Sequence, residues 1–226
     1  MQTPQHPVPG SQATVTAAVE GTVPVPPEVL VIACGALARE ILALRELNGW
    51  AHLKLTCLPA ELHNRPERIT ERVRERIRHY RQSFAGIFVA YADCGTGGGL
   101  DRMLAEEGVE RLPGAHCYQF FAGRQDFEQL AEQEPGSFYL TDFLARHFER
   151  LVIKGLKLDR YPELMPQIFG HYRRLVYLSQ SRDPELLQAA KQAAARLGLA
   201  FEHIHTGYGE LETSLHVQSL RRASIP

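Results

Sequence analysis

The sequence predicts an α/β protein with a three-layer, Rossmann-like architecture, in which a mostly parallel sheet lies between helices on both faces. Three observations support this prediction. Short runs of apolar and β-branched residues, such as VLVIAC at 29–34 and LVYLS at 175–179, are typical of strands buried on both faces. Segments with apolar residues at helical spacing alternate with these runs. This alternation implies crossover connections, which place helices on both faces of a parallel sheet.

In the first half of the chain, each predicted strand ends at a glycine or proline or at a glycine-rich loop, and a helix follows most of these ends. Gly35 ends the first strand, and Asn48 and Gly49 give the first helix a typical C-terminal stop signal. Pro59 ends the second strand, and an arginine-rich helix follows it. The predicted strands are 29–34, 52–58, 85–92 and 109–112, and the predicted helices are 36–47, 67–81 and 100–107.

In the second half, helical segments come first and two more strands follow. Thr141 is positioned to cap a helix, and Asp183, Pro184 and Gly198 supply the N-cap, first-turn proline and C-terminal glycine of another. The predicted helices are 124–132, 141–154, 162–171 and 184–197, and the predicted strands are 175–179 and 200–205. We expect a disordered leader at residues 1–27, a single α/β domain at 28–217 and a flexible tail at 218–226.

The composition excludes several classes of function. The chain has 226 residues and a formal net charge of −1, which gives no basic excess for nucleic acid. The arginines of 65–81 alternate with glutamates at helical spacing, so we expect an ion-paired, solvated helix face. No apolar run is long enough to span a membrane and no signal peptide is visible. Four cysteines in such a chain favour a cytoplasmic protein with reduced thiols.

The cysteines mark a candidate site. Cys34 closes the first predicted strand, Cys94 follows the third, and Cys117 follows the fourth. The carboxyl ends of parallel strands share one edge of the sheet, where ligands bind in α/β folds. Residues remote in sequence are therefore expected to meet there. Cys57 lies within a strand and is expected to be a core residue, because cysteine is often buried as a small hydrophobe.

Two histidines accompany these cysteines. His63 lies in the loop after the second strand, and His116 adjoins Cys117. Thiolates and imidazoles are the preferred ligands of zinc and also suit iron, so the predicted metal ligands are Cys34, Cys94, Cys117 and either His63 or His116. Packing without any metal remains the alternative for each cysteine, and no catalytic residue can be assigned.

Other residues are expected to line the pocket around these ligands. The glycines after Cys94 predict a tight turn that shapes its loop, with a phosphate-binding turn as the alternative. Asp93 is expected to orient a ligand, to act as a base or to cap this turn. Tyr208 and Glu210 follow the last predicted strand and are expected at the same sheet edge. The predicted pocket residues are Asn64, Asp93, Gly95, Gly97, Gly98, Tyr118, Tyr208 and Glu210.

An ordered series of segments runs along the chain from residue 29 to 215: CGALAREI, LPAELHNRPERI, YADCGTGG, HCYQFFAG, FYLTDFLARHF and GYGELE. This series resembles domain-of-unknown-function family 1638. Its blocks fall on Cys34, His63, Asn64, Cys94, Gly95, His116 and Cys117. Members are often encoded beside corrinoid-dependent methyltransferases of the trimethylamine type, so the resemblance implies a corrinoid protein or a methyltransferase as a partner.

Three functions remain open from the sequence. The first is a zinc- or iron-binding protein of one-carbon metabolism, which activates a thiol or a methylated small-molecule substrate. The second is a non-catalytic module that binds a metal, a corrinoid or a small ligand. The third is a thiol redox protein in which Cys94 and Cys117 form a reversible disulfide.

Overall fold

The computed structural model describes residues 28–220, and the predicted leader at 1–27 lies outside them. All seven strands of this part are paired in parallel, which confirms the α/β class. The strands form two sheets rather than the single sheet expected from the alternation, with orders β2-β1-β3-β4 and β5-β6-β7. The strands are β1 Val29–Cys34, β2 Leu53–Leu58, β3 Gly86–Ala90, β4 Glu110–Arg111, β5 Ser137–Leu140, β6 Arg174–Ser179 and β7 Ala200–His205.

The first sheet ends at β4, because that strand is only two residues long and pairs only with Phe88 and Val89. The chain then enters helices, and the next strand pairs with β6 instead of extending the first sheet. Each sheet has its own hydrophobic core. We name the two halves the first lobe (residues 29–122 and 208–220) and the second lobe (residues 124–205). The prediction of one domain over 28–217 stays a prediction.

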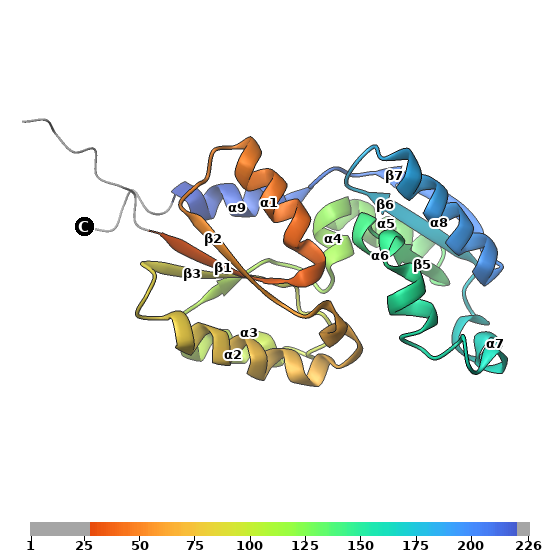
Figure 1. Ribbon diagram of the computed structural model, residues 1–226, viewed down its shortest axis with the longest axis horizontal. Coiled ribbons are helices and arrows are strands. Elements are labelled where there is room, and N and C mark those ends of the chain that lie inside the picture. Colours follow the sequence, from red (N-terminus) through yellow and green to blue (C-terminus); the bar gives the residue numbers. More distant parts are fainter. Residues whose placement is uncertain (1–27, 221–226) are drawn as a thin grey trace, which may run out of the picture.

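The first lobe has three layers (Figure 1). Helices α1 Ala38–Leu47 and α9 Glu210–Leu220 cover one face of the sheet, and α2 Ile69–Tyr80 and α3 Gly99–Glu107 cover the other. Val31 and Ile32 of β1 are fully buried between these layers. Helix α9 extends to Leu220, and the rest of the predicted tail at 218–226 lies outside the described part.

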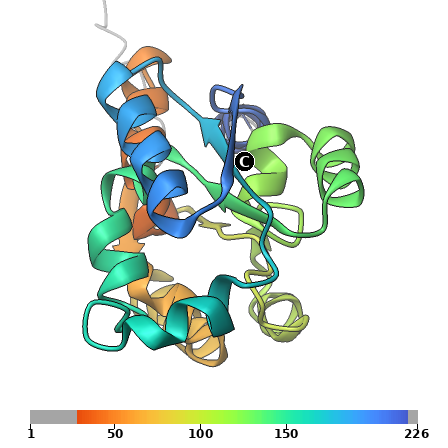
Figure 2. The ribbon, with the colours of Figure 1, turned by 90° about the vertical axis from the view of Figure 1, so that its right-hand side faces the viewer.

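The second lobe also has helices on both sides of its sheet (Figure 2). Helices α8 Pro184–Leu197 and α6 Asp142–Arg146 pack together on one side, while α5 Arg124–Gln133 lies on the other, next to α4 Cys117–Ala122 at the end of the first lobe. The helix predicted at 141–154 is divided into α6 and a π-helical turn. The remaining elements are α7 Met165–Phe169 and the short turns η1 Gly35–Leu37, η2 Ala60–Asn64, η3 Pro66–Arg68, η4 Glu149–Ile153 and η5 Pro162–Leu164.

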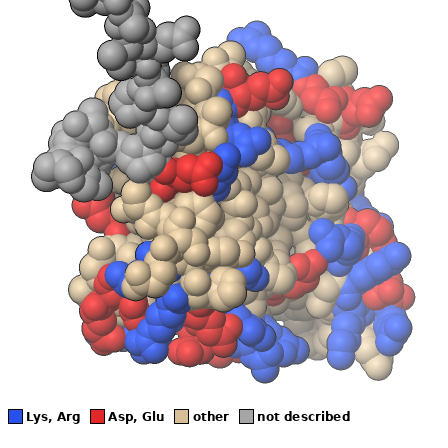
Figure 3. All heavy atoms as spheres, turned by 60° about the vertical axis from the view of Figure 1, so that its left-hand side comes forward, with Lys and Arg blue, Asp and Glu red and all other residues tan. Residues whose placement is uncertain are grey.

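The arginine-rich helix α2 is ion-paired, as expected from its glutamate spacing. Arg74 contacts Glu106 at 2.5 Å, and Arg78 and Arg81 contact Glu107 at 2.8 and 2.9 Å. Figure 3 shows basic and acidic side chains interleaved over the lower part of the first lobe, where α2 and α3 lie. No helix within residues 28–220 is long and apolar enough to cross a membrane.

The carboxyl ends of the strands in one lobe lie opposite the carboxyl ends of the strands in the other. Strands β1 and β3 end toward the second lobe, and β5, β6 and β7 end toward the first lobe (Figure 1). Cavities between the lobes are lined by residues that follow strands of both sheets. In α/β folds, ligands bind at the carboxyl ends of parallel strands. Here the carboxyl ends of both sheets border one cleft.

Candidate functional site

Cys34 and His63 form the centre of the site. Cys34 is the last residue of β1 and is 3% exposed. Its Sγ accepts a hydrogen bond from the Ala36 amide at 3.4 Å and lies 3.5 Å from Nδ1 of His63. The turn η2 begins directly after Pro59 and carries His63 back over the end of β1.

This pair is electrically neutral. Burial raises the pKa of Cys34 to about 12, and the neighbouring Cys94 thiol adds to the rise. Burial lowers the pKa of His63, and the nearby His116 lowers it further. The thiol is therefore protonated at neutral pH and can donate its proton to Nδ1 of the imidazole.

Cys94 lies in a strained loop between β3 and α3. Its φ angle is +50°, in the left-handed region that non-glycine residues rarely adopt. Its amide donates to the Ala115 carbonyl at 2.9 Å, so the loop after β4 fixes the backbone of Cys94. Burial raises the pKa of the Cys94 thiol to about 11.

Asp93 caps the glycine turn, which is one of the expectations for this residue. Its carboxylate accepts hydrogen bonds from the Thr96 hydroxyl and from the amides of Gly97 and Gly98, at 3.2 and 3.0 Å for the amides. Burial raises its pKa, but these hydrogen bonds outweigh burial and lower the pKa overall. Gly95, Gly97 and Gly98 have φ angles of +83°, +60° and +76°, so the cluster shapes the Cys94 loop as predicted.

Cys117 completes the group at the start of α4. Burial raises the pKa of its thiol well above the usual value, and the thiols of Cys94 and Cys34 raise it further. Three thiols and one imidazole thus share a small cavity of about 10 Å³, which is lined by Cys34, His63, Cys94 and Cys117. This volume is about that of one water-sized sphere.

Tyr91 forms part of the wall of this small cavity. It is 1% exposed, and its hydroxyl lies beside the Cys34 thiol without a complete hydrogen bond to any described residue. Burial raises the pKa of this hydroxyl. The Cys34 thiol is the polar group nearest to hand for this hydroxyl, and its interaction with the thiol raises the pKa of Tyr91 further.

A larger cavity of about 210 Å³ adjoins the small one. His63 and Cys117 line both cavities, so the sulfur-lined space borders a space of small-molecule size. From the first lobe the larger cavity also has Asn64 and Tyr118, as predicted. From the second lobe it has Phe138, Thr141, Phe143, Leu144, Leu151, Val152 and Leu156.

Several other predicted residues do not line the two cavities at the cysteines. Of the two histidines, His63 lines the cavities and His116 does not. Tyr208 and Glu210 follow β7 of the second sheet rather than the edge that carries the cysteines, and Tyr208 lines a separate cavity. Within residues 28–220, no group of three or more His, Cys, Asp and Glu side chains is arranged to hold a metal ion.

The fold and the cleft define a two-lobed α/β protein with a small-molecule-sized space between two parallel sheets. The chain belongs to the family described as a protein of unknown function, DUF1638, whose model matches residues 57–215. The match includes His63, Cys94 and Cys117 and begins after Cys34.

Among curated proteins, none matches the sequence. Among solved structures, ornithine carbamoyltransferase from Pyrococcus furiosus is similar to 80% of this chain, at 14% sequence identity and a TM-score of 0.28. The chain spans about half, 55%, of the length of that structure.

Proposed function

We propose that the chain binds a zinc or iron ion through Cys34, Cys94, Cys117 and His63, beside a pocket for a small organic molecule. One observation carries the proposal. Two ligands held at about 2.3 Å (sulfur) and about 2.0–2.1 Å (nitrogen) by a tetrahedral zinc lie about 3.5 Å apart. This is the distance between Cys34 Sγ and His63 Nδ1. On binding, the Cys94 and Cys117 side chains would turn inward over the small cavity.

The electrostatics of the metal-free site support a cationic ligand. Each of the three thiols has a raised pKa, chiefly because burial disfavours the thiolate. Neighbouring thiols add to the rise for Cys34 and Cys117, and the charge of Asp93 adds to it for Cys94. A divalent cation reverses this preference, so binding would release thiol protons and become tighter as the pH rises. The same raised pKa values disfavour the thiol redox alternative, since the thiolate is the reactive form.

The proposed chemistry is methyl transfer to a thiol. A metal ion held by these residues would supply the acidity that deprotonates a substrate thiol at neutral pH, with the substrate sulfur taking the place of one of the four protein ligands. The substrate sulfur then attacks the methyl carbon of a donor, and the donor keeps the electron pair of the broken bond. Tyr118 and Asn64 line the 210 Å³ cavity, where they can contact the substrate. The volume of this cavity is below the roughly 300–1,000 Å³ of drug-sized pockets. A corrinoid in this scheme is carried by a partner protein.

Metal analysis tests the proposal. Protein made in metal-replete medium and purified under reducing conditions is expected to contain about one zinc or iron per chain. Cys94→Ser is expected to lose the metal. Cys57→Ser is the matched control, because Cys57 lies on β2 and lines neither cavity. A metal-free wild-type protein, or equal metal loss in both variants, would overturn the proposal.

A non-catalytic ligand-binding module is the second candidate. It is favoured by the lack of a preformed metal group in the described residues and by the apolar second-lobe wall of the larger cavity. In this case the metal-free protein binds its small ligand, and Cys94→Ser leaves that affinity unchanged. Calorimetric titration of wild type and Cys94→Ser with a candidate ligand distinguishes the two candidate functions. A metal-dependent site loses affinity for the ligand in the variant, and a metal-independent module does not.

A further inference from the structure

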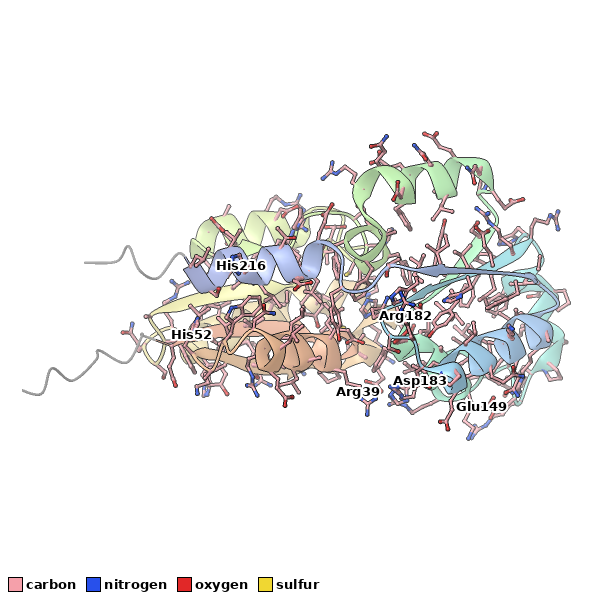
Figure 4. The ribbon with its side chains drawn as sticks, turned by 90° about the horizontal axis from the view of Figure 1, so that it is seen from above. Arg39, His52, Glu149, Arg182, Asp183 and His216 are labelled. Atoms are coloured by element: carbon pink, nitrogen blue, oxygen red, sulfur yellow. The ribbon has the colours of Figure 1, made fainter. Side chains whose placement is uncertain are left out.

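A second cavity of about 220 Å³ lies in the same cleft. It shares no lining residue with the two cavities at the cysteines. Arg39 and Glu40 come from α1 of the first lobe, and Asp142 and Arg146 come from α6 of the second. Figure 4 shows Arg39 near Arg182 and Asp183 at the place where the two lobes meet.

Glu40 is the unusual residue of this cavity. It is only 7% exposed, and its Oε2 is buried without a hydrogen-bond partner among the described residues. Burial raises the pKa of this carboxyl group, and nearby Asp142 raises it further. A buried carboxyl oxygen without a donor is destabilising, so its retention at a cavity indicates that a donor from outside the chain completes it.

The two other acids of the cavity, Asp142 and Asp183, already have donors within the chain. Asp183 accepts a hydrogen bond from the Glu185 amide at 2.9 Å. Asp142 accepts hydrogen bonds from the Tyr177 hydroxyl at 2.7 Å and from the amides of Gln180 and Ser181 at 3.0 and 2.8 Å. These bonds hold it in place between α6 and the loop after β6. Asp142 therefore orders the wall, and Glu40 is the acid left to meet a ligand.

The two arginines of the cavity can still donate hydrogen bonds to a ligand. Arg39 is exposed and makes no hydrogen bond or ion pair with residues 28–220. Arg146 meets Asp183 only at 3.8 Å, which is too long for a hydrogen bond. Arg39, Arg146 and Glu40 line the same space, and the charges of both arginines lower the pKa of Glu40 and so offset part of its rise. No hydrogen bond joins either arginine to Glu40 within the described residues, so each group can also take a partner of opposite charge.

We propose that this cavity binds a small zwitterion with a carboxylate and an ammonium group, which is the chemistry of a free α-amino acid. The guanidinium groups of Arg39 and Arg146 receive the carboxylate, and Oε2 of Glu40 accepts a hydrogen bond from the ammonium group. The ammonium charge also stabilises Glu40 as a carboxylate. This site is additional to the proposed metal site.

Thermal unfolding of the full chain with each of the twenty standard L-amino acids, at about 10 mM, identifies the ligand by the rise in Tm that selective binding to the native state produces. The best amino acid is then titrated by calorimetry against wild type, Arg39→Ala and Glu40→Gln. Both variants are expected to bind at least about tenfold more weakly, because each leaves one ligand charge unpaired.

Two matched controls lie on the same helix. Arg45 and Glu46 belong to α1 but do not line the cavity, so Arg45→Ala and Glu46→Gln should bind like wild type. The amine and the acid that each lack one charged group of the amino acid should also bind more weakly. The proposal is overturned if no amino acid raises Tm, or if either Arg39→Ala or Glu40→Gln binds as tightly as wild type. Neither result depends on the metal content of the protein.

Discussion

At the scale of single residues, Cys34 links the stability of the metal-free protein to pH. Its pKa is about 12 in the folded chain against a usual 9.0, so the folded state holds the thiol proton more tightly than the unfolded state. The associated stability is complete below pH 9 and is lost as the pH rises toward 12. The loss at pH 10 is expected to be about 1.4 kcal/mol.

Urea unfolding of chelator-treated protein at several pH values between 8 and 10 measures this loss. Cys34→Ser should lose less stability over that range, because serine does not titrate there. The other cysteines, whose pKa values are raised in the same direction, account for the part that remains. An unchanged loss in Cys34→Ser would show that the Cys34 thiol is not the titrating group.

Gly209 is a second residue whose role can be measured. A Cβ atom there would lie 2.4 Å from the carbonyl oxygens of both Phe120 and Phe121, and its φ angle is +51°. Gly207→Ala is the matched control, because Gly207 has a φ of +60° but no atom within 4 Å of its Cβ position. Thermal or urea unfolding should give a loss of about 1 kcal/mol for Gly207→Ala and about 2–4 kcal/mol for Gly209→Ala. Equal losses would contradict the close approach.

At the scale of elements, the loop between β3 and α3 depends on Asp93. Asp93→Ala removes the acceptor for Thr96, Gly97 and Gly98, and a loss of about 1–3 kcal/mol in the free energy of unfolding is expected. Metal affinity should fall as well, since the same loop carries Cys94. Asp159→Ala, an exposed site on the second lobe, should change neither quantity. Urea unfolding and metal titration give the two values.

The elements predicted correctly are those with strong periodic or apolar signals. Strand β1 and helix α8 appear at the predicted residues, because a continuous apolar run and a complete set of caps define them. No such signal marks β5, which has four residues, or α4, which has six, and neither element was predicted. Helix α9 was not predicted either, because its two buried leucines, Leu211 and Leu215, are too few to form an apolar stripe.

At the scale of the whole molecule, the last helix belongs to the first lobe. The chain crosses to the second lobe after α4 and returns with α9, whose Leu211 and Leu215 are fully buried in the first core. Leu215→Ala is therefore expected to destabilise the first lobe by about 2–5 kcal/mol. Val217→Ala, at a residue that is 40% exposed, should cost less than about 0.5 kcal/mol. Unfolding followed by the fluorescence of Trp50, which lies beside His216 of α9, reports on this lobe.

The candidate site could be predicted from the sequence only on the side of the first lobe. Cys34, Cys94 and Cys117 follow strands of one parallel sheet, and the edge rule alone brings them together. The opposite wall could not be inferred in this way, because Phe138 and Thr141 belong to a second sheet. Its position depends on the packing of two lobes, for which no local sequence signal exists. The unpaired Oε2 of Glu40 was likewise invisible, since its burial depends on the same packing.

The close approach at Gly209 has a consequence for how the protein could change over time. The chain leaves the first lobe at Phe121 and re-enters it at Gly209, and these two points are in contact. The second lobe is therefore topologically an insertion whose ends lie side by side. Such a segment can be exchanged for another of different sequence without altering the path of the chain in the first lobe. One conserved half of the cleft could in this way be combined with different opposing walls, and so with different substrates.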